Sequence, residues 1–350
     1  MRSRTSGGRA VTTIAGVAVA LSAVLADPAH ARTLHAPVVT EFPVTPGSGP
    51  TFLAAGAGGT VWFTELTGDR IGRIGDGGAL TEFPIPTPEG APLDVTAGPD
   101  GAMWFTEFLG NKIGRITGAG DITEVPIPTP GSRPEGIATG PDGNLWFTEG
   151  AAGKIGRLRP AGGITEFPVP TSGSAPHAIT AGPDGAMWFT EPGGNRIGRI
   201  TLTGRITEFA LPTPRSDPHR IVTGPDHALW FTERGVDRIG RITPSGRITE
   251  FQLAEGGQPL DIAPGANGDL WFTERAAGRV GRITRTGKIT HFAVPTSAAE
   301  PLGITAGAGG TIWFAEGASD RIGRLRATRR TAPPPGAWRG ASTSAGEAWR

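Results

Sequence analysis

Cysteine and tyrosine are absent from the 350 residues, and methionine occurs only three times. Without cysteine, neither a disulfide framework nor a thiolate metal site can form. Net charge is also small, because 33 Lys and Arg stand against 32 Asp and Glu. Within residues 38–325 the balance is 24 to 30, so this region lacks the basic surface that phosphate binding requires. We therefore expect no nucleic-acid partner.

Long hydrophobic runs are limited to one, near the N-terminus. Three arginines within the first nine residues precede an apolar run over residues 10–26, and Ala29-His30-Ala31 has the small-x-small form of a cleavage site. Together they predict that residues 1–31 are a cleaved signal peptide, that the protein is secreted, and that it has no membrane association after cleavage. A retained anchor is the alternative, but a run of about 17 residues is short for a spanning helix.

Glycine and proline, by contrast, are abundant, with 56 and 33 residues respectively. They are the two poorest helix formers, so an all-helical fold is excluded. Such a composition is also typical of low-complexity disorder. We apply that interpretation only to residues 326–350, a basic, proline-rich tail without apolar periodicity that we expect to be disordered.

In residues 38–325 the glycines and prolines instead recur with a fixed period, together with tryptophan. Seven tryptophans are spaced by 42, 42, 42, 42, 41 and 42 residues, and each begins a Trp-Phe-(Thr/Ala)-Glu tetrad. About ten residues later each unit has an (Ile/Val)-Gly-Arg motif, and turn signals divide the unit into four short strands. Four strands in about 42 residues are typical of a propeller blade. The sequence predicts an all-β, seven-bladed β-propeller as a single domain.

The outer strands indicate how the ring closes. Six Thr-Glu-Phe-like strands follow the first six tryptophans, whereas the seventh, Val39 to Pro43, precedes the first blade. The last blade ends at Leu325 without an outer strand of its own. We therefore expect the N-terminal strand to complete the last blade, which removes two exposed sheet edges.

Residues that occur in every blade are expected to have a structural role within the blade. We expect each tetrad glutamate to form an ion pair or hydrogen bond with the arginine of the Gly-Arg motif, because guanidinium binds carboxylate in bidentate fashion. The tryptophans are expected to pack the blades. In the outer strands, the Ile-Thr-Glu-Phe pattern is taken to direct the glutamate toward solvent.

Residues that break the repeat are candidates for function. In each blade a proline begins the innermost strand, which lines the centre of a propeller. The residue after that proline is, blade by blade, Thr51, Leu93, Glu135, His177, His219, Leu260 and Leu302. Ionisable groups thus gather on consecutive blades, as an asymmetric site would require.

Three charged residues extend this ionisable arc, namely Arg133, Asp217 and Arg220. Either His177 or His219 could act as a base, because the ordinary histidine pKa is near 6.5, and Asp217 could orient one of them. The alternative is that both histidines merely form hydrogen bonds at a wet channel mouth.

The repeats resemble those of the virginiamycin B lyases. The resemblance rests on units such as Gly182-Pro183-Asp184-Gly185-Ala186-Met187-Trp188-Phe189-Thr190-Glu191 and covers all seven blades. It implies a seven-bladed propeller that linearises a cyclic depsipeptide of the streptogramin B type by elimination at the ester, with Mg²⁺. It also implies Pro-His in one blade, Glu-Pro-His in the next, and a metal-binding glutamate in the tetrad of that next blade.

Matched end to end, the family's histidine positions carry Leu260 and Leu302 here, with Glu300 and Glu316 at the metal positions. The histidine constellation occurs two blades earlier, as Pro176-His177, Asp217-Pro218-His219 and the tetrad Glu233. Rotation by two blades preserves geometry in a pseudo-seven-fold ring, so this is a candidate relocated site.

The resemblance assigns roles to the relocated residues. It implies His219 as the catalytic base, and Asp217 and Glu233 as ligands of Mg²⁺. From their place in the ionisable arc we expect His177, Glu135 and Arg220 to bind the substrate. An aromatic substrate contact expected one blade further on is replaced by Leu260. The expected partner is a small cyclic peptide or lactone, bound by a monomer.

Two other functions remain open. The chain could be a non-catalytic extracellular propeller that binds a cell-wall, peptide or protein ligand, because propellers host unrelated functions. It could also be a lactonase-like hydrolase with an axial Ca²⁺, to which Glu135, Asp217 and Glu300 would contribute, although these three residues are spread widely around the ring.

Overall fold

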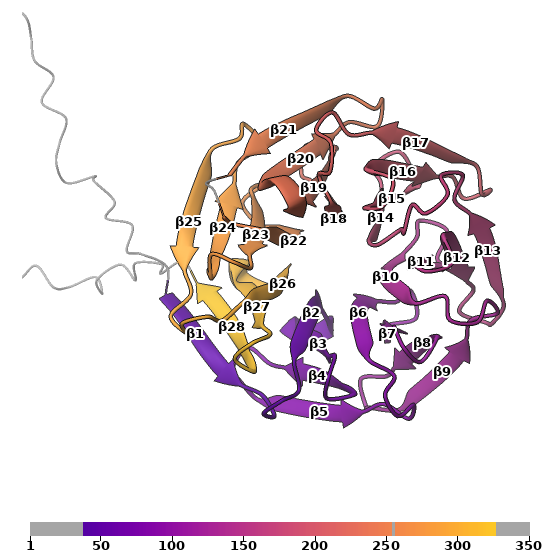
Figure 1. Ribbon diagram of the computed structural model, residues 1–350. Helices are drawn as coiled ribbons and strands as arrows, with labels where there is room; N and C mark the ends of the chain where they lie inside the picture. The colour runs from indigo at the N-terminus through magenta and orange to yellow at the C-terminus, as the bar shows by residue number, and fades with distance from the viewer. Residues whose placement is uncertain (1–37, 254–255, 327–350) are drawn as a thin grey trace, which may run out of the picture. The chain divides into compact units, whose positions relative to one another are not determined.

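The computed structural model describes residues 38–253 and 256–326 (Figure 1). The predicted signal peptide and the predicted tail beyond Arg326 lie outside these residues. The described chain forms seven four-stranded antiparallel sheets arranged in a ring, with essentially no helix. The predicted all-β, seven-bladed propeller is confirmed. No helix within the described residues is long and apolar enough to cross a membrane.

The blades follow one another along the chain, each running from an inner to an outer strand. The first three comprise β2 (Pro50–Ala55), β3 (Val61–Glu65), β4 (Arg70–Ile74) and β5 (Leu80–Pro84); β6 (Pro92–Ala97), β7 (Met103–Glu107), β8 (Lys112–Ile116) and β9 (Ile122–Pro126); and β10 (Pro134–Thr139), β11 (Leu145–Glu149), β12 (Lys154–Leu158) and β13 (Ile164–Pro168).

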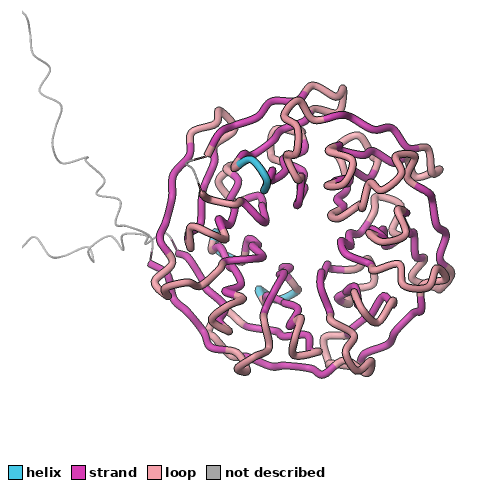
Figure 2. Tube along the Cα trace, viewed as in Figure 1, coloured by secondary structure: helices cyan, strands magenta, loops and turns pink. Residues whose placement is uncertain are grey.

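The next three blades comprise β14 (Ile179–Ala181), β15 (Met187–Glu191), β16 (Arg196–Ile200) and β17 (Ile206–Ala210); β18 (Pro218–Thr223), β19 (Leu229–Glu233), β20 (Arg238–Ile242) and β21 (Ile248–Gln252); and β22 (Pro259–Pro264), β23 (Leu270–Glu274), β24 (Arg279–Ile283) and β25 (Ile289–Ala293). Short 3₁₀ turns occur at η2 (Ala57–Gly59), η3 (Arg234–Val236) and η4 (Ala308–Gly310) (Figure 2).

The seventh blade closes the ring with strands from both ends of the propeller. It consists of β26 (Pro301–Ala306), β27 (Ile312–Glu316) and β28 (Arg321–Arg326), and β1 (Val38–Pro43) is its outer strand. Strand β1 pairs antiparallel with β28, from Val38 opposite Arg326 to Pro43 opposite Arg321. The closure predicted from the missing outer strand is therefore correct.

The core lies between neighbouring blades. The cluster that joins the first and last blades, for example, packs Phe63 and Ile74 against Trp313 and Ile322. The glycine of each Gly-Arg motif makes room for the tetrad phenylalanine, since a Cβ on Gly72 would lie 2.0 Å from the ring of Phe63. Apolar burial repeated at seven interfaces is the main stabilising contribution to the ring.

The Gly-Arg arginine stacks on tryptophan, so the predicted ion pair with the tetrad glutamate is wrong. Antiparallel register places Trp62 opposite Arg73, and Glu65 opposite Arg70. The Arg73 guanidinium carbon lies 5.2 Å from the centroid of the Trp62 ring, a cation–π distance. All seven blades have an arginine–tryptophan pair of this kind among the described contacts.

The tetrad glutamates are fully buried. Those that have no hydrogen-bond partner for either carboxyl oxygen in the described chain are Glu65, Glu107, Glu149, Glu191 and Glu233. Burial raises the pKa of each, to about 7 or 8. In the sixth blade His291 replaces the outer-strand glutamate, and Glu274 pairs with His291 and Arg279.

The outer-strand glutamates do not face solvent as predicted. Glu82 is 16% exposed, and its carboxylate accepts hydrogen bonds from the backbone N–H and the hydroxyl of Thr45 at 3.0 and 2.5 Å. The same arrangement recurs from Thr87 to Glu124. The glutamate thus holds the loop that follows the preceding outer strand.

Candidate functional site

Two rings of side chains face the central axis near the start of the inner strands. In β18, Pro218 lies opposite Glu233 and Ile221 lies opposite Phe231, so His219 and Arg220 form a bulge between them. Bulges redirect side chains out of the regular alternation. The first ring contains the residues that follow the inner-strand proline, including His219; the second ring contains Phe52, Asp94, Gly136, Ala178, Arg220, Asp261 and Gly303.

The tetrad threonines hold these bulges in place and join each blade to the next. Thr190 Oγ1 accepts a hydrogen bond from the Ala178 backbone N–H at 3.0 Å and donates to the His219 carbonyl at 2.9 Å. Thr232 makes the same two contacts with Arg220 and Leu260. The positions of the first-ring backbone are therefore fixed by hydroxyl groups of the blade before.

The structure brings His177 and His219 together. Their ring centroids lie 3.9 Å apart, with 40° between the ring planes. His177 Nδ1 lies 3.2 Å from the His219 carbonyl, and His219 Nδ1 lies 3.2 Å from the Leu260 carbonyl. A carbonyl can only accept, so both Nδ1 atoms carry a proton, and in the neutral rings each Nε2 atom has a lone pair.

Burial keeps both imidazoles neutral. It lowers the pKa of His177 to about 3, and the positive charge of Arg220 acts in the same direction. Burial also lowers the pKa of His219 well below its ordinary value, assisted by His177, Arg234 and Arg220. Each ring is thus available as a base at neutral pH without first losing a proton.

Glu135 extends this pair to the third blade. Its Oε2 lies 3.2 Å from His177 Nε2, and the two side chains are 20% and 16% exposed. Its Oε1 fills the space above Gly150, where an added Cβ would lie 2.4 Å away. Burial raises the pKa of Glu135 to about 7, although Arg220 and Arg133 oppose the rise.

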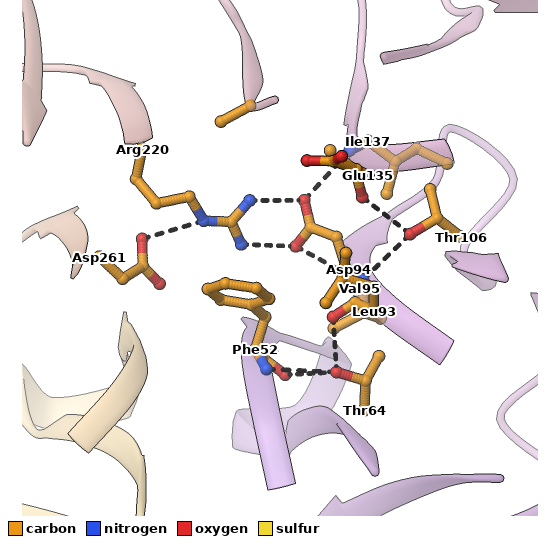
Figure 3. A network of polar contacts seen from close by, with 12 residues as sticks. Phe52, Thr64, Leu93, Asp94, Val95, Thr106, Glu135, Ile137, Arg220 and Asp261 are labelled. Carbon is orange, nitrogen blue, oxygen red and sulfur yellow. Dashed lines mark hydrogen bonds and ion pairs between the residues drawn. The ribbon is translucent and has the colours of Figure 1, made fainter. Parts of the chain in front are cut away.

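The Arg220 side chain extends toward Asp94, with Asp261 on its other side and Phe52 against its guanidinium (Figure 3). Its Nη1 and Nη2 donate to the two carboxylate oxygens of Asp94 at 2.9 and 2.7 Å, and its Nε lies 3.4 Å from Asp261. The guanidinium carbon lies 3.7 Å from the centroid of the Phe52 ring. With both carboxylates engaged, the guanidinium has no free edge for a substrate, which disfavours the predicted substrate-binding role.

The two aspartates extend this contact to further blades. Asp94 accepts the backbone N–H of Ile137, and Asp261 accepts that of Ile304. We call the group of Arg220, Asp94, Asp261 and Phe52 the axial clasp, because it links side chains or backbone of six blades. Beyond it the inner strands line a cavity of about 330 Å³.

Asp217 and Glu233 do not form a magnesium site as they are arranged here. Arg234 Nε lies 2.8 Å from Asp217 Oδ2, so a guanidinium occupies the carboxylate that the metal would take. Among the described residues, four other blades also have a tetrad glutamate whose carboxyl lacks a hydrogen-bond partner. This feature of Glu233 therefore belongs to the repeat and does not indicate a functional site. Burial, with Glu250 nearby, raises the pKa of Glu233 to about 8, which disfavours the ionised form that a cation needs. Within the described ranges no group of three or more His, Cys, Asp or Glu residues is arranged so that it could hold a metal ion.

Comparison with known proteins agrees with this architecture. The model of the virginiamycin B lyase family matches residues 26–229 and 220–332. This chain belongs to the virginiamycin B lyase family. A solved streptogramin B lyase structure is 40% identical, with a TM-score of 0.81, over 83% of this chain and 98% of that one.

Two further solved structures are members of the same family. Virginiamycin B lyase from Staphylococcus aureus is 45% identical, with a TM-score of 0.79, over 83% of this chain and 99% of that one. A catalytically inactive histidine-to-alanine variant of the Staphylococcus aureus lyase with quinupristin is 44% identical, with the same TM-score and coverage. No curated protein matches this chain.

The end-to-end family positions have a different environment in this lyase-family chain. Leu302 packs over Gly317, where an added Cβ would lie 2.4 Å from its Cδ1. Glu300 is 45% exposed and pairs with Arg275 at 2.7 Å. Of the two regions, only the one on blades three to five has imidazoles and a carboxyl within contact of one another.

Sequence reasoning missed the partners of Arg220. Asp94 and Asp261 occupy the same second-ring position in their blades as Arg220 does in its own. Opposite charges at one ring position are a visible signal, because a ring brings distant blades to one axis. Arg234 was missed as the partner of Asp217, and no repeat position could have shown it.

Proposed function

We propose that this chain catalyses elimination at the ester of a cyclic depsipeptide lactone, with His219 as the base. One observation carries the proposal: His219 Nδ1 donates to the Leu260 carbonyl at 3.2 Å, which leaves Nε2 unprotonated beside His177. Family membership and the 44% identical relative with quinupristin support the substrate class. The proposal includes secretion of the chain, on the strength of residues 1–31.

In this reaction His219 Nε2 removes the α-proton of the residue whose side-chain oxygen forms the ester. The electrons of the C–H bond form a carbon–carbon double bond, and the C–O bond breaks to release the carboxyl group. No water enters the product. A positioned base of this kind contributes roughly 10²- to 10⁴-fold to a rate.

Mg²⁺, which the family resemblance implies, would polarise the ester carbonyl. Because Asp217 is paired with Arg234, the proposal assigns no step to the ion. Positive charge beside the imidazoles comes instead from Arg234 and Arg220, both of which lower the pKa of His219.

The test uses quinupristin as the probe. We expect an isomeric product of unchanged mass, a new alkene absorbance, and no oxygen-18 uptake from labelled water. Uptake of one labelled oxygen would show hydrolysis, in favour of a lactonase. Binding without any product would favour the non-catalytic propeller, and either result would contradict the proposal.

A further inference from the structure

The Glu135 carboxyl occupies a defined position next to His177. The carboxyl fills a space that exists only because residue 150 is glycine, and its Oε2 faces His177 Nε2 at 3.2 Å. In the described part of the chain this carboxyl contacts no other polar group within hydrogen-bond distance. The equivalent first-ring residues of the first, second, sixth and seventh blades are threonine or leucine, so Glu135 serves no repeated structural role.

The number of protons shared by Glu135 and His177 can be inferred from the hydrogen bonds of His177. The Nδ1 proton of His177 is used by the His219 carbonyl, so His177 Nε2 presents a lone pair to Glu135. An ionised carboxylate would present a second lone pair at 3.2 Å, and two lone pairs repel. One further proton held by the pair, on either Glu135 or His177, removes this repulsion.

The surroundings place that proton on the carboxyl. A proton on His177 would create a buried imidazolium beside Arg220, Arg234 and the His219 ring, all of which lower the pKa of one or both histidines. A proton on Glu135 leaves both partners neutral, which burial favours. Arg220 and Arg133 act against the protonated carboxyl, but burial is the larger effect.

We propose that Glu135 is the proton donor of this site, a neutral carboxylic acid that donates to His177 Nε2 in the resting protein and to the leaving carboxyl oxygen during elimination. This inference rests on the proposed function. His219 takes the α-proton while Glu135 gives its proton to the departing oxygen. The product leaves as a carboxylic acid and then ionises in water. Transfer of a proton from the His219 imidazolium to the Glu135 carboxylate restores both groups.

The first experiment needs no substrate. Infrared difference spectra of the full chain at pH 5.5, wild type minus Glu135→Gln, should show a protonated carboxyl band that belongs to Glu135. This pH lies below the raised pKa of Glu135 and above the lowered pKa of His177. In nitrogen-15 spectra of the imidazoles, His177 should carry its proton on Nδ1 and accept at Nε2. A predominant Glu135 carboxylate band at pH 5.5, or a doubly protonated His177, would overturn the inference whatever the enzyme does.

The second experiment measures quinupristin elimination. Glu135→Gln should reduce kcat by roughly 10²- to 10⁴-fold and remove the fall in rate on the alkaline side of the pH profile, where Glu135 ionises. Gly150→Ala should act similarly, because the added methyl group displaces the carboxyl. Gly317→Ala is the matched control, since it displaces Leu302 in the same way on the opposite arc.

Full activity of Glu135→Gln would overturn the inference while leaving the proposed function intact. If the wild-type protein does not convert quinupristin, the proposed function is wrong. The infrared band alone then decides whether the proton lies on Glu135. Equal losses in Gly150→Ala and Gly317→Ala would also count against it, because the effect would then come from blade packing.

Discussion

Arg220 and Asp94 are joined across the axis of the propeller by two hydrogen bonds of 2.9 and 2.7 Å, although 126 residues separate them in the sequence. The contact links the fifth blade to the second, and Asp261 adds the sixth. Apolar burial between the seven similar sheets is not directional. A buried ion pair is directional, so it favours one arrangement of the blades around the axis.

Replacement of Arg220 by Met should destabilise the protein by about 3–5 kcal/mol, because Asp94 and Asp261 would remain buried and negatively charged without a partner. Urea unfolding monitored by tryptophan fluorescence measures the loss. The triple variant Arg220→Met, Asp94→Asn, Asp261→Asn should recover part of it. A single variant as stable as wild type would show that the axial clasp is dispensable.

The buried tetrad glutamates should make stability fall as pH rises from about 4.5 toward 8. The pKa of Glu191 is raised to about 8 by burial, with Glu208 nearby, whereas an unfolded glutamate ionises near its ordinary value of 4.5. Between these values the folded state holds the proton and the unfolded state does not. The free energy of unfolding therefore decreases with pH, by up to about 1.4 kcal/mol per pH unit for each such carboxyl.

This fall is best measured between pH 6.5 and 8, because His177 and His219 in the unfolded chain titrate near 6.5, so their opposing effect on stability is confined to the lower end of that range. Urea midpoints should be lower at pH 8 than at pH 6.5. Glu191→Gln should show a smaller decrease, since one titrating carboxyl is gone. Parallel pH profiles for the variant and the wild type would contradict the prediction.

Much of the fold was predictable because its signals are local and repeated. The 42-residue tryptophan period gave the number of blades, and the outer strand at residues 39–43 gave the closure. The Gly-Arg arginine was misassigned because periodicity alone does not give register. Antiparallel pairing brings Trp62 opposite Arg73, which leaves Glu65 opposite Arg70.

The site was only partly predictable, since its contacts cross the ring. Position within the repeat identified Glu135, His177 and His219, which do lie together. It could not show that Arg220 turns toward Asp94, because side-chain direction at a bulge depends on the facing blades. Nor could it show that Arg234, in the short turn after β19, pairs with Asp217 of the same blade. Their assigned roles in binding substrate and metal remain predictions.

Removal of Arg234 should increase affinity for divalent cations. Arg234→Ala frees the Asp217 carboxylate, which is 2.8 Å from the guanidinium in the structure. Titration with Mn²⁺, followed by electron paramagnetic resonance, should show tighter binding than in the wild type. Arg275→Ala, which frees Glu300 in the same way at the end-to-end family position, is the comparison. Unchanged Mn²⁺ affinity in Arg234→Ala would show that the ion pair with Arg234 does not prevent Asp217 from binding a metal.

The central claim is that the chemistry lies on blades three to five rather than at the end-to-end family positions. The most direct test is kcat/KM for quinupristin elimination in His219→Ala, Glu300→Gln and Glu316→Gln. We predict a loss of roughly 10²- to 10⁴-fold in His219→Ala, the contribution of a positioned base, and values within about 2-fold of wild type in both glutamate variants. Retained activity in His219→Ala with loss in Glu300→Gln or Glu316→Gln would contradict the account.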